Sequence, residues 1–455
     1  MLASEINVCS DKAVVFFRRF AELSELGRNP PRLSKGKLMS MTFKKAFGLI
    51  AASAVALSMS ACGGAGGNSA GGQSEDVSLS VWAPQEDQAD GNSWLAKMEE
   101  SFAKAHPEYK ITWKNDVVSE GDAKTKVETD PAAAADVYMF ANDQLGGLLD
   151  AEAIGELGEN EAKQVKEQNE PSMVDSVTGT DGKIYGVPFT SNTWFMYYNS
   201  KKFSAEDAKS LDAMLAKGKV SFPLDNSWFI QSFYTKGAGL TFFGDKGNDA
   251  AKGITFADGD AAATAVTKYL VGLANNPNFM DDAEGSGLGA LKAGDTDVLF
   301  SGTWDAANVK EALGDGYAAA KLPTYKLDGK DVQMEAFAGS KAVAYNPHAK
   351  NAKAAAQFAA FLGSTEAQKA HYEMRGIVPT DKSLVDSVTD DDFAAKAQLE
   401  VISGASILQP TISAMGSWWD PAQAFGKGIL NKEITEATAE AQTQKWSEQL
   451  AKMVG

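Results

Sequence analysis

Short alternating and helical hydrophobic patterns follow one another along the chain from Val77 onward. Residues 77–81 (VSLSV) and 110–113 alternate in polarity, which predicts two strands, and residues 93–106 between them carry apolar side chains at helical spacing. The other predicted strands are Asp136 to Phe140, Ile184 to Val187, Phe195 to Tyr198 and Asp297 to Phe300. The other predicted helices are Leu145 to Leu149, a segment after Phe300 running through Val309, Ala352 to Leu362, Glu366 to Met374, Asp392 to Ile402 and Glu433 to Met453. Strands that alternate with helices predict α/β layers.

An export signal precedes this body. Residues 41–62 (MTFKKAFGLIAASAVALSMSAC) begin with Lys44 and Lys45 and continue with an apolar run that is long enough for a signal peptide but short for a membrane-spanning helix. Small residues precede Cys62 and two glycines follow it, so the segment resembles the lipobox of bacterial lipoproteins, in which the cysteine is lipidated. An ordinary cleaved signal peptide with an unrelated cysteine is the alternative interpretation.

The segments on either side of the signal complete the predicted organisation. Residues 63–74 (GGAGGNSAGGQS) have the composition of a flexible linker, which would hold a folded body away from a membrane. Residues 1–40 lie upstream of the signal, and we interpret them as an extension that results from the choice of start codon, with Met39 or Met41 as the true start. We therefore expect an extension at 1–40, a lipoprotein signal peptide at 41–61, a lipid anchor and linker at 62–76, and the body after it.

Composition narrows the function of the body. A chain of 455 residues with 44% hydrophobic residues can build two domains with real cores. Its formal net charge of -17 disfavours binding to nucleic acid or to anionic lipid surfaces. Both cysteines, Cys9 and Cys62, precede the body, and the three histidines are far apart in sequence, so we expect no disulfide framework, no metal site and no cofactor.

Tryptophans fall where predicted strands end and helices begin. Trp304 follows a strand, Trp228 follows an Asp-Asn-Ser group typical of a helix N-cap, and Trp418 and Trp419 precede an Asp420-Pro421 pair that predicts a helix start. Such positions face the ligand crevice of α/β proteins, although each ring could instead fill the core. Flat rings cover the C–H face of a pyranose, and carboxylate and amide groups pair with its hydroxyls. Tryptophans interleaved with Asp87, Asp143, Asn192 and Asn226 therefore predict a sugar-binding cleft.

Several segments of the body carry a resemblance to a known family. They are ADVYMFANDQLGGLL (135–149), GKIYGVPFTSNTWFMYYNSK (182–201), LKAGDTDVLFSGTWD (291–305), KLPTY (321–325) and ILQPTISAMGSWWDPAQAF (407–425). From about Val77 to the C-terminus, the chain resembles the maltose and maltodextrin-binding proteins of ABC importers. The resemblance implies two discontinuous α/β lobes joined by hinge strands, an N-lobe of residues 77–190 plus 338–390 and a C-lobe of residues 191–337 plus 391–455.

The resemblance also implies roles for individual residues. Asp143 would accept hydroxyl hydrogen bonds, Trp228, Trp304 and Trp419 would stack on successive sugar rings, and Asp87 and Gln88 would form a polar pair in the first strand-helix loop. The chain departs from the family pattern at Phe140, Gln144, Asn192, Asn226 and Gln423, which removes charged partners and makes an oligosaccharide a firmer expectation than maltose. The full predicted ligand-binding set is Asp87, Gln88, Phe140, Asp143, Gln144, Asn192, Asn226, Trp228, Trp304, Trp418, Trp419 and Gln423.

We therefore expect a lipid-anchored extracellular solute-binding protein, not an enzyme, that closes around an oligosaccharide such as a malto-oligosaccharide. We expect it to act as a monomer at the outer face of the cytoplasmic membrane and to deliver its ligand to ABC importer permease subunits. The alternatives are a secreted glycoside hydrolase, which needs two carboxylates flanking one bond, and the same fold with a different ligand. A sugar phosphate would favour clustered basic residues, and Arg375 is the only arginine after Cys62.

Overall fold

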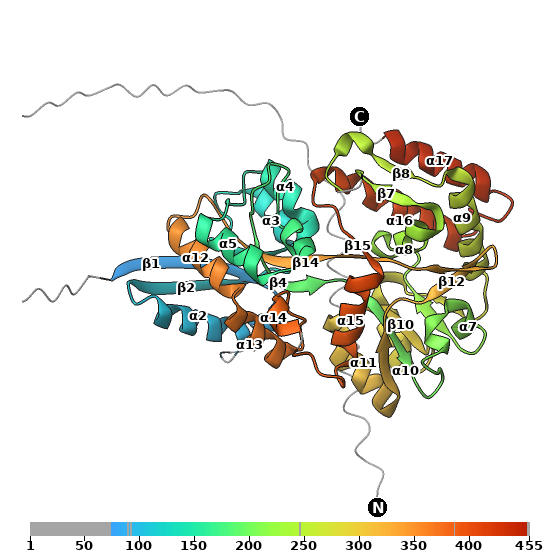
Figure 1. Ribbon diagram of the computed structural model, residues 1–455, viewed down its shortest axis with the longest axis horizontal. Helices are drawn as coiled ribbons and strands as arrows, with labels where there is room; N and C mark the ends of the chain where they lie inside the picture. Colours follow the sequence, from blue (N-terminus) through green and yellow to red (C-terminus); the bar gives the residue numbers. More distant parts are fainter. Residues whose placement is uncertain (1–73, 89–90, 92, 245–246, 386, 453–455) are drawn as a thin grey trace, which may run out of the picture. The chain divides into compact units, whose positions relative to one another are not determined.

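The computed structural model describes residues 74–88, 91, 93–244, 247–385 and 387–452 (Figure 1). The predicted extension, the signal peptide, Cys62 and nearly all of the predicted linker lie outside these residues. In the described part of the chain, no helix is both long enough and apolar enough to cross a membrane.

The N-lobe is built on a six-stranded sheet in the order β15-β14-β3-β1-β2, with β4 also paired to β14. Its strands are β1 (Glu75–Ala83), β2 (Tyr109–Val117), β3 (Val137–Ala141), β4 (Val187–Asn192), β14 (Ala336–Tyr345) and β15 (Ser406–Leu408). β1 runs parallel to β2 and β3, and β14 runs antiparallel to β3 and β4. The helices of this lobe are α2 (Trp94–Ala105), α3 (Ala123–Thr129), α4 (Leu145–Asp150), α5 (Glu159–Gln168), α6 (Pro171–Asp175), α12 (Ala352–Leu362), α13 (Thr365–Arg375) and α14 (Lys382–Val385).

The burial of strand β3 shows that helices cover this sheet on both faces. All but the last of its residues are buried, because successive side chains point to opposite faces of the sheet and both faces carry helices. Val137 and Met139 join the core formed with α2 and α12, whereas Tyr138 and Phe140 join the core formed with α3, α4 and α5. The turn that follows β3 therefore begins at the end of a central strand that is buried on both faces.

The C-lobe is built on a five-stranded sheet in the order β11-β5-β10-β6-β9 and has one large hydrophobic core. Its sheet contains β5 (Phe195–Asn199), β6 (Val220–Phe222), β9 (Phe279–Asp281), β10 (Val298–Ser301) and β11 (Tyr317–Ala320), and two hairpins add β7 (Leu240–Phe242), β8 (Ile254–Phe256), β12 (Thr324–Leu327) and β13 (Lys330–Gln333). Its helices are α7 (Leu211–Leu215), α8 (Ser227–Ala238), α9 (Asp260–Ala274), α10 (Gly287–Ala293), α11 (Ala306–Leu313), α15 (Phe393–Gly404), α16 (Gly416–Leu430) and α17 (Ala439–Lys452).

Three chain segments connect the lobes side by side, and in Figure 1 β4 and β14 run through the middle of the described body. Gly339 of β14 pairs with Asn192 at the end of β4, and Ala338 pairs with Leu408 of β15. The buried Thr193 hydroxyl donates to the Phe337 carbonyl oxygen at 2.7 Å. These contacts hold the crossing segments together, so the two lobes share one hydrogen-bonded hinge.

Most predicted elements are confirmed, and four predictions are corrected. The strand predicted at Ile184 to Val187 is β4, which begins at Val187. The strand predicted at 77–81 is β1, which extends from Glu75 to Ala83. The last helix begins at Ala439, because Lys432 adopts a left-handed φ of 62° and Ile434 folds back onto Gly428. Helix α16 begins at Gly416 and contains Pro421, so the Asp420-Pro421 pair does not start it.

Candidate functional site

A cleft with a volume of about 430 Å³ lies between the lobes at the hinge. It is lined by Glu120, Gly121, Ala141, Asp143 and Lys341 of the N-lobe, by Trp228, Trp304 and Trp419 of the C-lobe, and by Asn192 and Gln409 of the crossing segments. The structure thus brings five of the twelve predicted ligand-binding residues into one cavity: Asp143, Asn192, Trp228, Trp304 and Trp419.

The C-lobe side of the cleft is an aromatic wall, by which we mean Trp228, Trp304 and Trp419. Trp228 lies in the first turn of α8, and the Asn226 side chain caps this helix by accepting from the Trp228 backbone N–H at 2.9 Å. Trp304 lies in the turn between β10 and α11, 42% exposed, and its ring centroid is 6.2 Å from that of Trp228. A large indole exposed inside a concave cavity offers its face to a ligand.

Gly302 supports the Trp304 ring from behind. A Cβ atom built on Gly302 would lie only 2.0 Å from the nearest ring carbon, so the indole packs directly on the glycine backbone. The Tyr197 hydroxyl donates to the Gly302 carbonyl oxygen at 2.8 Å and fixes that backbone. One face of the indole is therefore supported, which leaves the other face available to the cleft.

The adjacent Trp418 and Trp419 have different environments because successive residues of a helix point in different directions. Trp419 is half-buried and lines the cleft. Trp418 is fully buried in the C-lobe core, where its indole N–H donates to the Ser227 carbonyl oxygen at 2.9 Å. The prediction that Trp418 contacts the ligand is therefore corrected: this ring anchors α16 to the start of α8.

The N-lobe side of the cleft carries the polar groups. Asp143 lies in the 3₁₀ turn Asn142–Gln144 that follows β3, and burial raises the pKa of its carboxyl to about 6 against the lowering effects of the local backbone and Lys124. The Lys341 ammonium lies 3.2 Å from a carboxylate oxygen of the buried Glu120. The cleft thus contains a carboxyl group and an ion pair opposite the aromatic wall.

Three of the predicted residues brace the N-lobe instead of lining the cleft. The buried Asp87 carboxylate lies 3.0 Å from His371 Nε2, and although burial raises its pKa, His371 and Arg375 outweigh that effect and lower it. The Gln88 amide donates to the carbonyl oxygens of Ala83 and Asp116. Phe140 is fully buried in the core. Asp87, Gln88 and Phe140 therefore make structural contacts within the N-lobe and are not among the residues that line the cleft.

Gln144 has an indirect relation to the cleft. Its amide nitrogen donates to the Gly121 carbonyl oxygen at 2.7 Å, and its amide oxygen accepts from the Lys124 backbone N–H at 3.0 Å. This largely buried side chain therefore binds Gly121 and the first turn of α3, which directly follows the loop that carries Glu120 and Gly121. Gln144 thus supports the wall of the cleft and does not line it.

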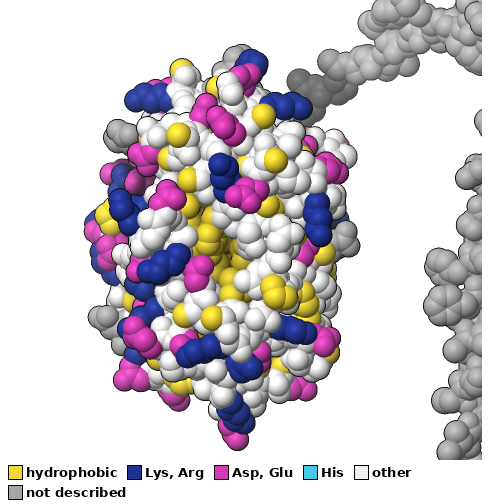
Figure 2. Space-filling model, turned by 90° about the vertical axis from the view of Figure 1, so that its right-hand side faces the viewer, with side chains coloured by type: hydrophobic (Ala, Val, Ile, Leu, Met, Phe, Trp, Pro, Cys, Tyr) yellow, Lys and Arg dark blue, Asp and Glu magenta, His cyan; other side chains and the backbone are white. Residues whose placement is uncertain are grey.

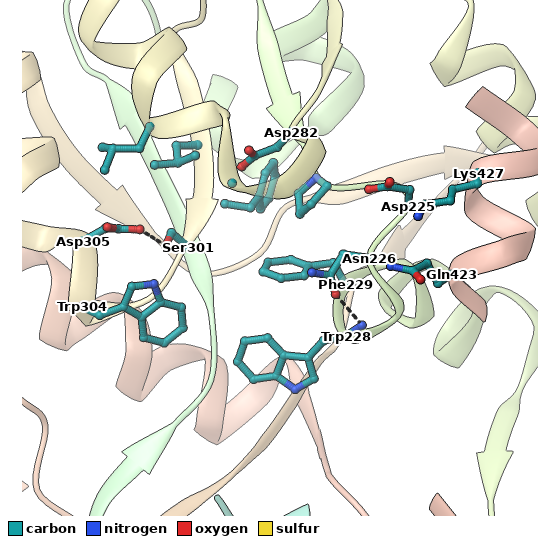
Figure 3. Close-up of a pocket in the computed structure, with 15 residues that line it drawn as sticks. Asp225, Asn226, Trp228, Phe229, Asp282, Ser301, Trp304, Asp305, Gln423 and Lys427 are labelled. Carbon is teal, nitrogen blue, oxygen red and sulfur yellow. Dashed lines mark hydrogen bonds between the residues drawn. The ribbon is translucent and has the colours of Figure 1, made fainter. Parts of the chain in front are cut away.

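A second pocket of about 400 Å³ lies in the C-lobe and shares Trp228 and Trp304 with the cleft. Figure 3 shows the two tryptophans on one side of it and Asn226, Gln423 and Lys427 on another. Asn226 and Gln423, both predicted ligand-binding residues, line this pocket, not the main cleft. It also contains carboxylates, among them Asp305, which accepts a hydrogen bond from Ser301.

Sequence reasoning missed Glu120, Lys341 and Gln409. Lys341 lies on β14, which the hydrophobic pattern did not reveal, and Gln409 follows the short strand β15. The only available signal was the ILQPT segment itself, which carried the family resemblance without a role for its glutamine.

Among the described residues, no group of three or more His, Cys, Asp or Glu side chains could hold a metal ion. On the face shown in Figure 2, acidic and basic side chains are interspersed.

Comparison with known proteins identifies the family. Residues 97–401 match the model of bacterial extracellular solute-binding proteins. The chain belongs to this family. A maltooligosaccharide ABC transporter solute-binding lipoprotein of Streptococcus pneumoniae is 28% identical over 350 residues, which cover 71% of this chain and 79% of that relative. The similarity to this relative therefore extends over most of both chains.

Two solved structures share its two-lobe α/β fold. One, determined with acarbose, is 45% identical with a TM-score of 0.79 and covers 84% of this chain and 100% of its own. The other is the maltodextrin binding protein MalE1 from L. casei BL23 without ligand, which is 30% identical with a TM-score of 0.75 and covers 83% of this chain and 100% of its own.

Proposed function

We propose that the protein captures a malto-oligosaccharide by closing its two lobes around it and delivers the sugar to an ABC importer. One observation carries the proposal: the aromatic wall of Trp228, Trp304 and Trp419 faces Asp143 and the Lys341–Glu120 pair across one cleft. The names of the relatives support the ligand class, since they concern maltooligosaccharide and maltodextrin, and a 45% identical chain was solved with acarbose.

The chemistry of the cleft suits a linear sugar. Indole faces cover the apolar C–H faces of successive pyranose rings, while the carboxylate, ammonium and amide groups pair with hydroxyls along the rim. The Lys341–Glu120 pair supplies charge-assisted hydrogen bonds of the kind that the departures at Gln144, Asn192 and Asn226 remove. We expect an affinity in the micromolar range, which corresponds to roughly -8 kcal/mol.

Capture and release follow from lobe closure. We propose lobes of residues 77–190 plus 338–390 and 191–337 plus 391–455 that rotate about the hinge, so that the ligand is buried between the aromatic wall and Asp143. Strand β15 of the second lobe joins the N-lobe sheet at the hinge, where it pairs with β14. The closed form predominates with ligand because contacts with both lobes exist only there. The permease then distinguishes the closed form from the open one.

The location of the protein is part of the proposal. Export through the signal at 41–61 and lipidation of Cys62 would tether the body, as a monomer, to the outer face of the bacterial cytoplasmic membrane. The name of the Streptococcus pneumoniae relative, a solute-binding lipoprotein, supports the tether. A tethered body stays close to its importer, so modest affinity suffices for transport.

We propose binding without catalysis. A glycoside hydrolase needs one carboxylic acid and one free carboxylate at a defined separation across the scissile bond. Of the two carboxyl groups in the cleft, Asp143 and Glu120, the second is engaged by Lys341. A different oligosaccharide in the same cleft is the second candidate, because aromatic rings can stack on the flat C–H face of many different pyranoses.

The test is a titration of the purified body from Gly63 onward. Maltotriose, maltotetraose and acarbose are compared with cellotetraose, the β-linked isomer of the tetrasaccharide, by calorimetry and tryptophan fluorescence. We expect saturable heat with the α-glucans, little with cellotetraose, and at least tenfold weaker binding by Trp304→Ala. Saturable heat with cellotetraose alone would favour the second candidate. Shorter sugars that appear in the same tubes, detected by chromatography, would contradict binding without catalysis.

A further inference from the structure

Gln409 lies where the two lobes meet. It follows β15 and is only 3% exposed. Its backbone N–H donates to the Ala338 carbonyl oxygen at 2.8 Å, and its own carbonyl oxygen accepts from the Asn142 side-chain amide at 3.2 Å. Its main chain is therefore fixed to β14 and to the turn that carries Asp143.

The side chain of Gln409 reaches the aromatic wall. Its amide oxygen accepts a hydrogen bond from the indole N–H of Trp228 at 2.8 Å, across 181 residues of sequence. The residue lines the sugar cleft on one side and a separate cavity of about 570 Å³ on the other. Gln409 thus lies between two cavities, with its backbone bound to the N-lobe and its side chain bound to a C-lobe tryptophan.

This hydrogen bond constrains the orientation of the Trp228 ring. An indole has one polar atom, and in a partly buried position it adopts the rotamer in which that N–H is paired. The other contacts of Trp228, an edge-to-face contact with Phe229 and a tilted contact with Trp304, are apolar and tolerate sliding. The hydrogen bond is the directional contact, so Gln409 fixes the plane in which Trp228 meets a sugar.

We infer that Gln409 is a positioning residue. It fixes the position of Trp228, which stacks on a sugar ring, relative to Asp143, which accepts hydrogen bonds from the hydroxyls of the sugar. The inference rests on the proposed function and deepens it. Asn142, bonded to the Gln409 carbonyl oxygen, directly precedes Asp143, so a single residue links the sites on the two lobes. Through this link, the hinge segment at Gln409 couples lobe closure to the orientation of the stacking ring.

The experiment is a double-mutant cycle with maltotetraose as the probe. Gln409→Met has a similar volume, keeps the backbone hydrogen bonds and removes the acceptor, whereas Trp228→Phe keeps an aromatic face and removes the donor. We expect Gln409→Met to weaken binding about three- to tenfold, the net worth of one hydrogen bond. In the Trp228→Phe background the same substitution should have no further effect. Gln444→Met, at an exposed position on α17, is the matched control and should bind like the wild type.

A spectroscopic readout separates positioning from general damage. In ¹⁵N-tryptophan-labelled protein, the Trp228 indole N–H signal, assigned through Trp228→Phe, should shift and exchange faster in Gln409→Met, while the other indole signals stay in place. Equal losses of affinity in both backgrounds would overturn the inference, as would unchanged affinity after the indole signal has moved. The wild-type titration tests the proposed function by itself: a wild type that does not bind any α-glucan overturns that function and the inference with it.

Discussion

Gly302 offers a steric test of the aromatic wall without a change to any aromatic residue. The φ and ψ of Gly302, -112° and -171°, are open to any residue, so alanine introduces no backbone strain there. Its Cβ, however, would lie 2.0, 2.3 and 2.4 Å from three carbons of the Trp304 ring. Carbon atoms pack at about 3.5–4.0 Å, so the ring must move by roughly 1.5 Å.

The size of the effect follows from the surface that the ring covers. One pyranose face of on the order of 60 Å², valued at about 25 cal/mol per Å², corresponds to ~1.5 kcal/mol. A ring displaced by more than 1 Å loses most of that contact, and ~1.5 kcal/mol is about tenfold in affinity. Gly302→Ala should therefore weaken maltotetraose binding about tenfold, close to the loss in Trp304→Ala.

Calorimetric titration with maltotetraose tests this prediction on four proteins: wild type, Gly302→Ala, Trp304→Ala and the double variant. In the double variant no ring remains to be displaced, so its affinity should equal that of Trp304→Ala alone. Thermal unfolding of the single glycine variant should stay close to the wild type, because the displaced ring is partly exposed. Unchanged affinity in Gly302→Ala, or a further loss in the double variant, would refute the reasoning.

Three further predictions concern the pair Trp418 and Trp419, the cleft residue Asp143, and the buried Asp87. Trp419→Ala should weaken maltotetraose binding about tenfold with little loss of stability, whereas Trp418→Ala should cost about 3–5 kcal/mol of unfolding free energy in urea; similar behaviour of both variants would contradict their different environments. Because the pKa of Asp143 is raised to about 6 and its ionised form accepts sugar hydroxyls best, affinity should fall as the pH drops from 7.5 to 5, and Asp143→Asn should flatten that profile; a flat wild-type profile would count against the role of Asp143. Asp87→Asn removes the buried carboxylate that lies 3.0 Å from His371 Nε2 and should cost about 1–3 kcal/mol of stability near neutral pH, with no loss of sugar affinity. The pKa of Asp87 is below its usual 3.8 in the folded protein, so the contribution of the pair is present above that pH and lost as the pH falls through the lowered value, which urea unfolding at a series of pH values measures.

Local patterns in the sequence were enough to locate most helices and strands and to indicate the class of fold. Periodic apolar positions located β1, α2, β3 and α12 to within about two residues, because side-chain period and caps act over short distances. Strands alternating with helices indicated α/β layers, and the family resemblance supplied two lobes. The N-cap at Asn226 is a local hydrogen bond, so the start of α8 could be predicted from four letters of sequence.

Which of the candidate side chains contact one another depends on the packing of elements that are distant in sequence. Asp87 is paired with His371, 284 residues away, and the Trp228 indole with Gln409, 181 residues away; no local pattern encodes either contact. Adjacent tryptophans diverged because α16 begins five residues earlier than its Asp-Pro pair indicated, at Gly416 instead of Pro421, which turned Trp418 into the core and left Trp419 at the cleft. The Lys341–Glu120 pair required β14 to cross between the lobes beside the loop after β2. Periodicity fixes the direction in which a side chain points from its own element, whereas its partner depends on how distant elements pack.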